Sequence, residues 1–190
     1  LNFQVIKKKL QDCVYKTEFK NLWVVPSSKG LSDIQTKLES RYKINKLSQG
    51  IHTVEPVFKF DEIIIDTPPA LNFFRTSALL ASDRILVPFD CDSYSKEALF
   101  FVEKIIRDLK EDHDLKIELE GVIINQFRKN TKISLKHIED LKKKGFPILE
   151  PYLPSSVIMK ESHSIQTPLP FMNKKHLLTK NFDILCKVLD

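Results

Sequence analysis

One segment of this sequence places a carboxylate, a hydroxyl and two prolines directly after an apolar run. The run Ile63–Ile65 is β-branched throughout, which predicts a strand that is buried on both faces and reaches Asp66. Pro68 and Pro69 cannot donate to a strand ladder, so they end the strand. Because ligands of open α/β sheets gather beyond the carboxyl ends of the strands, Asp66 lies where a metal ion with its phosphate groups would sit. The alternative is that Asp66 only caps the helix that follows.

A second candidate group is an amide at the end of another predicted strand. Asn125 ends the strand that is predicted to begin at Ile117. A side-chain amide at this place can present a donor and an acceptor together to the edge of an adenine base. Alternatively, Asn125 caps the turn into Gln126 and Phe127.

Lysines and arginines gather after this strand. The whole chain carries 30 Lys and Arg against 25 Asp and Glu, a net charge of +5 that is compatible with nucleic-acid binding. Arg128, Lys129 and Lys132 follow the predicted strand end on a loop, where they are candidates for contacts with DNA phosphates that do not read sequence. We interpret the run Lys142–Lys144 as a solvated helix face.

Strand and helix patterns alternate along the chain. Strands are predicted at 22–25, 63–66, 84–87 and 117–125, the third of them ended by Pro88. Helices are predicted from the first residues to Tyr15 and at 31–47, 72–82, 134–144 and 176–189, with one more that opens at Ser93 or Ser95. Gly145 is a predicted helix C-cap, and residues 46–57 are predicted to be a loop. This alternation predicts an α/β fold with a mostly parallel, twisted sheet flanked by helices.

Composition limits the class of protein. With 190 residues, 42% of them hydrophobic, the chain is long enough for one core and indicates a single domain. No apolar run approaches the roughly 20 residues of a membrane-spanning helix, which indicates a soluble protein. The 3 cysteines are far apart and the 5 histidines lack metal-ligand spacing, which favours a reducing compartment and argues against a zinc site.

Several stretches that follow one another in the same order carry a resemblance to a known family. Asp66–Leu71 with Thr76–Pro88 resembles the second half of the ParA-type partition ATPases, which are deviant-Walker P-loop NTPases of the ParA/MinD/Soj superfamily and segregate plasmids and chromosomes. Further matching stretches are Asn21–Ser28, Gly121–Phe127 and Tyr152–Val157, the last continuing to Leu169. The resemblance covers nearly the whole chain and implies the P-loop NTPase type of α/β fold.

The resemblance implies ATP and Mg²⁺ as cofactors. Asp66 is the implied catalytic carboxylate, which holds Mg²⁺ through its water shell. Thr67 and Pro68 match the family's segment that senses the terminal phosphate. Asn125 is implied to contact the adenine base, with the Pro154 turn on the other side of the base.

The same resemblance implies partners and a location. It describes an ATP-dependent homodimer that binds DNA non-specifically and a ParB-like centromere-binding protein, in the cytoplasm and on the nucleoid. A membrane-associated, MinD-like protein is disfavoured, because the predicted terminal helix mixes Lys180 and Lys187 with Asp183 on its polar side.

One part of the family pattern has no counterpart in this sequence. Its only glycines, at 30, 50, 121 and 145, are isolated, so none belongs to a Gly-rich phosphate-binding loop. We therefore expect residues 1–190 to be a single ParA-like domain without its first strand, P-loop and first helix, incomplete at the N-terminus and not hydrolytic alone. The missing strand would lie beside the strand that ends at Asp66, so its absence would expose strand edges. The alternative is a non-enzymatic ParA-like remnant that binds DNA or dimerises.

Overall fold

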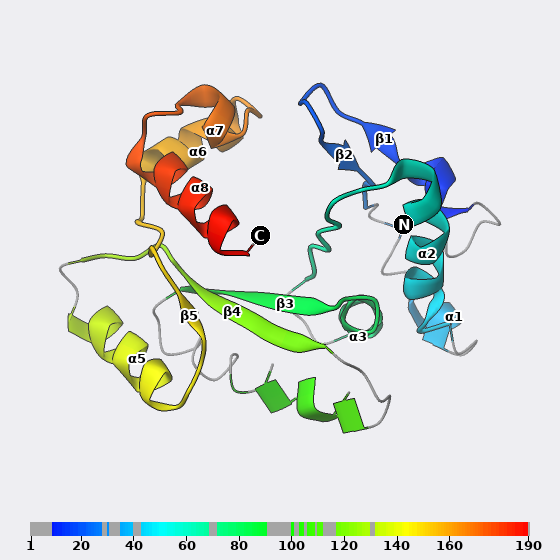
Figure 1. The fold of residues 1–190 in the computed structure, drawn as a ribbon, viewed down its shortest axis with the longest axis horizontal. Helices are drawn as coiled ribbons and strands as arrows, with labels where there is room; N and C mark the ends of the chain where they lie inside the picture. Colours follow the sequence, from blue (N-terminus) through cyan, green and yellow to red (C-terminus); the bar gives the residue numbers. More distant parts are fainter. Residues whose placement is uncertain are drawn as a thin grey trace. The chain divides into compact units, whose positions relative to one another are not determined.

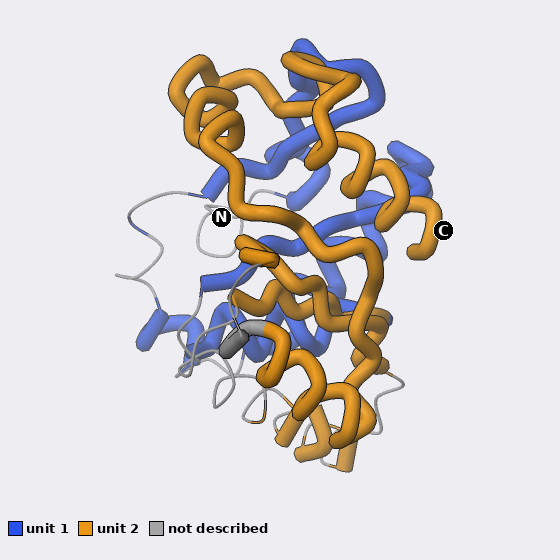
Figure 2. Tube along the Cα trace, turned by 90° about the vertical axis from the view of Figure 1, so that its left-hand side faces the viewer, with its two compact units in different colours: residues 1–83 blue, residues 84–190 orange. Residues whose placement is uncertain are grey.

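The structure, a computed structural model, describes most of the chain. The described residues are 9–27, 30, 35–39, 43–68, 72–90, 100, 103–104, 106–108, 110–111, 117–129 and 132–189. The chain divides into two compact units, Leu1–Asp83 and Arg84–Asp190 (Figure 2). The predicted helix that opens at Ser93 or Ser95 lies largely outside the described residues, although the positions described between 100 and 111 are helical.

Unit 2 is built on a parallel sheet of three strands in the order β3-β4-β5 (Figure 1). The strands are β3 (Arg84–Asp90), β4 (Glu118–Asn125) and β5 (Ile148–Leu149). This confirms the predicted parallel α/β fold. The prediction that Pro88 ends the third strand is wrong, because β3 continues to Asp90. A proline is tolerated there since β3 is an edge strand of the sheet that the described residues form, and an edge strand needs only one side of its ladder.

Helices cover both faces of this sheet. Helix α5 (Lys132–Lys143) lies on one side, and α6 (Val157–Ser164), α7 (Leu169–Met172) and α8 (Leu177–Leu189) lie on the other (Figure 1). The core beside α5 consists of Phe89, Val122, Ile124, Ile138, Leu141 and Phe146. The core beside α8 consists of Leu153, Leu169, Leu178 and Leu185, with Ile123 and Leu149 of the sheet packed against it. Strand β4 is therefore buried on both faces along its apolar part, Val122–Ile124, as the sequence predicts.

The helices of unit 2 agree with the sequence prediction. Helices α5 and α8 fall within one or two residues of the predicted ranges 134–144 and 176–189. Gly145 follows α5 with φ of 84°. This left-handed conformation favours glycine, so the predicted C-cap is confirmed.

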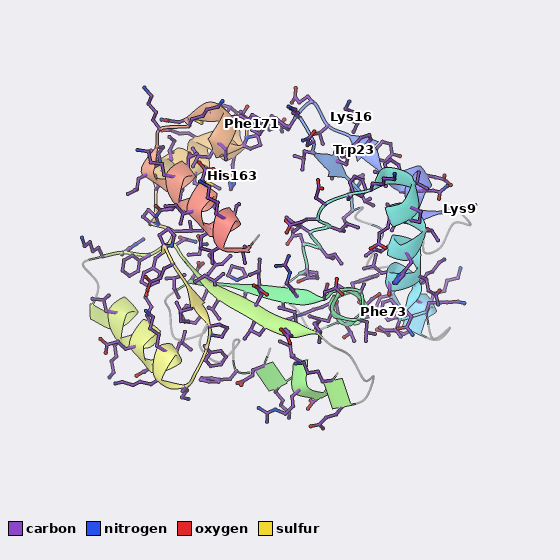
Figure 3. All side chains as sticks on the ribbon, viewed as in Figure 1. Lys9, Lys16, Trp23, Phe73, His163 and Phe171 are labelled. Carbon is purple, nitrogen blue, oxygen red and sulfur yellow. The ribbon has the colours of Figure 1, made fainter. Side chains whose placement is uncertain are left out.

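Unit 1 contains a short hairpin and three α-helices in the part of it that is described. The hairpin pairs β1 (Tyr15–Lys16) with β2 (Trp23–Val24) in antiparallel orientation. It follows a 3-10 helix at Leu10–Cys13, and the α-helices are α1 (Gln35–Glu39), α2 (Lys46–Phe58) and α3 (Phe73–Leu79). The Lys16 ammonium lies 5.9 Å from the ring centre of Trp23 across the hairpin (Figure 3).

The hairpin corrects two predictions. Tyr15 lies on β1, so the helix predicted from the first residues does not reach it, and residues 1–8 lie outside the described ranges. The strand predicted at 22–25 exists as β2, but it pairs with β1 and not with the parallel sheet. Strand propensity alone does not specify which strand becomes the partner.

Helix α2 occupies the segment that the sequence predicts to be a loop. Leu47, Ile51 and Val54 are buried, and their spacing places them on one helix face. Pro56 lies in the last turn, where its missing N–H and its ring disturb only the end of the helix. The prediction of a loop at 46–57 is therefore wrong.

The predicted buried strand at 63–66 is also wrong. Residues 62–68 have no regular secondary structure, and Ile63 and Ile64 are 42% and 89% exposed. No strand among the residues that are described pairs with this segment. A β-branched run can only be buried as a strand when neighbouring strands and helices cover it, and the local sequence does not report them.

The predicted helix after this segment is confirmed as α3, and its N-cap gives a test. The side chain of Asn72 accepts a hydrogen bond of 3.1 Å from the backbone N–H of Arg75. We expect Asn72→Ala to lower the free energy of unfolding by about 1 kcal/mol, because a helix N–H loses its acceptor. Urea denaturation followed by circular dichroism measures the change. Asn72→Ser is the control, since serine also caps; an equal loss in both variants would contradict this role of the Asn72 side chain.

Candidate functional site

A hollow of about 290 Å³ opens at the carboxyl end of β4 in unit 2. Asn125 is half-buried and is the last residue of β4. The residues that line the hollow are Asn125, Gln126, Pro154, Ser155, Ser156, Met159, Lys160, His163, Leu178 and Phe182. It lies at a strand end of a parallel sheet, which is where ligands of α/β proteins gather.

Backbone hydrogen bonds bring Pro154 to this strand end. Leu153 N–H donates to the Ile124 carbonyl (2.8 Å), and Phe127 N–H donates to the Leu153 carbonyl (2.9 Å). Ser155 N–H then donates to the Phe127 carbonyl (3.1 Å), so Phe127 and Pro154 form a parallel bridge. The structure therefore brings together Asn125 and Pro154, two residues that the sequence analysis assigned to one base.

The lining of the hollow suits a flat, partly polar ligand. Pro154, Met159, Leu178 and Phe182 supply apolar surface. The polar residues of the lining are Asn125, Gln126, Ser155, Ser156, Lys160 and His163. Lys160 and His163 belong to α6, and Figure 3 labels His163. Small-molecule sites commonly combine apolar walls with a few such groups. This chemistry fits a nucleobase.

The other predicted cofactor residues lie in unit 1. Asp66, Thr67 and Pro68 are exposed and belong to the irregular segment 62–68, so Asp66 does not end a strand. They line a second hollow of about 600 Å³, whose walls are largely apolar and include Trp23, Val24, Ile63, Ile65 and Phe74. Asp66 is thus in a different unit from Asn125 and Pro154.

The donor groups for Mg²⁺ and phosphates are incomplete among the described residues. These residues contain no group of three or more His, Cys, Asp or Glu side chains that could hold a metal ion. Asp66 as a lone exposed carboxylate fits Mg²⁺ that keeps its waters and also binds substrate phosphates. Gly50 lies within α2 and Gly121 within β4, so neither belongs to a phosphate-binding loop.

The basic residues divide into two groups. Arg128 and Lys129 are exposed on the segment after β4, as predicted; Lys132 begins α5, and its side chain is outside the described part. Lys142 instead forms an ion pair of 2.9 Å with Glu150, a contact that raises the pKa of Lys142 and lowers the pKa of Glu150. Lys144 lies 4.0 Å from the ring centre of Phe100. All three lysines of the run Lys142–Lys144 are exposed, which agrees with the interpretation of a solvated helix face.

Sequence reasoning missed the residues that complete the hollow. Lys160 and His163 are three residues apart on α6, on the same side of the helix. Their position after the Pro154 turn was a signal that they belong near Asn125. Gln126 carried no such signal, because its contribution depends on a backbone conformation and not on a motif.

Comparison with known proteins places this geometry in a family. The profile of a family described as AAA domain matches residues 1–120. The chromosome partitioning protein ParA of Caulobacter vibrioides is 23% identical over 160 residues, covering 83% of this chain and 60% of the relative. The sporulation initiation inhibitor protein Soj of Bacillus subtilis is 26% identical over 160 residues, covering 83% of this chain and 62% of the relative. The chain spans about 60% of the length of these curated relatives.

Solved structures with low sequence identity have the same fold. Apo McdA of Cyanothece superposes with a TM-score of 0.88 at 23% identity, covering 100% of this chain and 77% of that one. The cell division ATPase MinD of Pyrococcus furiosus gives a TM-score of 0.77 at 19% identity, covering 99% and 73%. A plasmid partition protein of Borrelia burgdorferi gives 0.67 at 24% identity, covering 91% and 70%.

This chain has a parallel sheet with helices on both faces, and its fold matches these structures. This is the fold of a P-loop NTPase. The chain belongs to the AAA domain family, and within it to the ParA/MinD/Soj-type P-loop ATPases, the group that includes the partition ATPases. The resemblance seen in the sequence is confirmed. Within the ranges that the structure describes, every helix is too short or too polar to cross a membrane.

Proposed function

We propose that this chain acts in plasmid or chromosome partition, as the body of an ATP-dependent homodimer that binds DNA non-specifically and a ParB-like centromere-binding protein. Family membership and the names of the ParA and Soj relatives support the proposal. The observation that carries it is the hollow in which Asn125 and Pro154 lie together at the end of β4. Such a protein works in the cytoplasm, on the nucleoid.

The proposal assigns the cofactor groups as follows. Asn125 pairs with the adenine base and Pro154 bounds the base on its other side. Asp66 holds Mg²⁺ through water, and Thr67 and Pro68 respond to the terminal phosphate. When bound, ATP with Mg²⁺ supplies the phosphoanhydride bond whose hydrolysis resets the dimer.

The hollow of unit 1 supports the proposal that the complete domain contains one more strand. Its walls include the β2 residues Trp23 and Val24 and the extended segment with Ile63 and Ile65. Exposed apolar side chains and unpaired backbone are the features that a neighbouring strand would cover. We place the family's first strand there, leading into the phosphate-binding loop of a single ParA-like domain.

The test compares this chain with a version that is extended upstream to carry a phosphate-binding loop. ATP binding and retention of DNA on a filter are measured for both, with Asp66→Ala as a variant of each. We expect only the extended form to bind ATP and then DNA, and Asp66→Ala to remove the ATP dependence. The short chain retaining DNA regardless of nucleotide would instead support a non-enzymatic DNA-binding module, an alternative favoured by its four isolated glycines.

The basic segment after β4 gives a more specific prediction. Replacing both Arg128 and Lys129 by alanine should make the slope of log binding constant against log salt less steep by about 2, because each lost phosphate contact releases one counterion fewer. The extended protein with ATP is titrated with duplex DNA at several salt concentrations. Lys180→Ala with Lys187→Ala removes the same charge from exposed positions of α8 and is the control. An equal change in both double variants would contradict a contact at Arg128 and Lys129.

A further inference from the structure

We propose that Asn181 is a positioning residue for the hollow at the end of β4: it fastens the segment that carries Pro154 to α8, so the affinity contributed by the base depends on it. The inference rests on the proposed function, since it takes this hollow as the site of the adenine. Asn181 does not line the hollow itself. Its role follows from the two parts of the lining that it joins.

Apolar side chains of the hollow come from segments that are far apart along the chain. Pro154 precedes α6, whereas Leu178 and Phe182 belong to α8. The distance between these two parts of the lining therefore depends on contacts that form only in the folded protein.

The contact that joins the two segments is a hydrogen bond of 2.8 Å from Asn181 Nδ2 to the Tyr152 carbonyl. The next residue, Leu153, uses both of its backbone groups on the strand end of β4. Its N–H donates to the Ile124 carbonyl, and its carbonyl accepts from the Phe127 N–H. The segment that leads into Pro154 is thus held by β4 through Leu153 and by α8 through Tyr152.

Asn181 occupies a position of α8 that the helix spacing gives to an apolar side chain. Leu178 and Leu185 are buried in the core beside α8, and Phe182 packs against that core. With Asn181, which is half-buried, these residues follow the spacing i, i+3, i+4 and i+7 of one helix face. An apolar residue could pack at this position, but it could not supply a donor to the Tyr152 carbonyl.

The side chain of Tyr152 holds the same segment independently of α8. Its ring meets the Phe127 ring edge to face, with 5.1 Å between the centroids and 70° between the planes. Its hydroxyl donates a hydrogen bond of 3.3 Å to Glu150 Oε1. Because these contacts do not involve Asn181, replacing Asn181 should leave the segment in place and loosen its connection to α8.

This arrangement has a consequence for ligand binding. A site whose walls are already at the right distance binds more tightly, because no affinity is lost in ordering them. Without the Asn181 bond, α8 must be ordered against the Pro154 segment when the base enters. The phosphates of ATP bind at the phosphate-binding loop in the proposed function. The loss should therefore be confined to ligands that carry a base.

The experiment uses the version extended upstream to carry a phosphate-binding loop, since the proposed function expects only this form to bind nucleotide. Isothermal titration calorimetry with Mg²⁺ compares two probes, ATP and inorganic tripolyphosphate, which has the phosphates without the base. We expect Asn181→Ala to weaken ATP binding by about 3- to 10-fold, the contribution of one hydrogen bond, and to leave tripolyphosphate binding unchanged. The ratio of the two affinities falls by the same factor.

A second variant removes the donor with little change of shape. Asn181→Asp should lower the ratio as Asn181→Ala does, because a carboxylate cannot donate to the Tyr152 carbonyl. Its added charge acts on the phosphates of both probes and cancels in the ratio. Asp183→Asn changes an exposed position of the same helix and is the control, which should leave the ratio unchanged.

The outcomes separate this inference from the proposed function. An unchanged ratio in either Asn181 variant, including an equal loss for both probes, would overturn the positioning role while ATP binding by the unmodified extended form still supports the proposed function. No ATP binding by the unmodified extended form would overturn the proposed function and the positioning role together.

Discussion

Ile124→Ala lowers the free energy of unfolding of unit 2 by about 2–5 kcal/mol, whereas Ile64→Ala changes that of unit 1 by no more than about 0.5 kcal/mol. Both residues belong to β-branched apolar runs, and the substitution removes the same atoms. Ile124 is 0% exposed in the core between β4 and α5, and Ile64 is 89% exposed. Removing Ile124 leaves a cavity that close-packed neighbours fill only partly, while removing Ile64 leaves none.

Urea denaturation followed by far-ultraviolet circular dichroism measures both changes. The single tryptophan, Trp23, lies in unit 1 and reports unfolding of that unit by fluorescence. A loss of several kcal/mol for Ile64→Ala would show that the segment 62–68 is covered in solution. That outcome would contradict the exposed segment described above and restore the buried strand that the sequence predicts.

The two isoleucine runs also show how far sequence reasoning reaches. The run in β4 was predicted correctly because β3 and β5 pair with it and helices cover both of its faces. The run Ile63–Ile65 has the same local pattern, but no described strand pairs with it. Burial is a property of the neighbours, so one pattern gave one correct and one wrong prediction.

Helices were predicted correctly where the spacing of their own apolar residues indicates them. Helices α5 and α8 each present an apolar stripe to a neighbouring core, and α3 has a clear N-cap at Asn72. Helix α2 was not predicted, although Leu47, Ile51 and Val54 have the spacing of one helix face. A proline near a helix end carries little information about the turns before it.

The candidate site was also predicted only in part. Asn125 and Pro154 were identified through family resemblance, and the structure places both around one hollow. The hydrogen bond from Gln126 Nε2 to Asp90 Oδ2 was not predicted, because it depends on strand register and on a left-handed glutamine. Neither property follows from residue type, so a motif search has nothing to detect.

Gly121→Ala destabilises unit 2 by about 1–3 kcal/mol through a close approach of β4 and β5. A methyl group at Gly121 would collide with the Leu149 side chain, which packs in the core beside α8. In a strand interior alanine is otherwise favoured over glycine by roughly 0.5–1 kcal/mol, so a loss identifies the collision as its cause. Chemical denaturation of the Gly121→Ala variant measures the effect.

Leu149→Ala provides the decisive comparison, because it removes the atoms with which the new methyl group would collide. The double variant Gly121→Ala with Leu149→Ala should be more stable than the sum of the two single losses predicts, by about 1–3 kcal/mol. Gly145→Ala is the matched control, since open space surrounds Gly145 and only its φ of 84° opposes a side chain. Its cost of about 1–2 kcal/mol should add to that of Leu149→Ala without coupling. Strictly additive losses in the Gly121 pair would mean that β4 and β5 separate to admit the methyl group, and that the sheet beside the hollow is less rigid than its packing indicates.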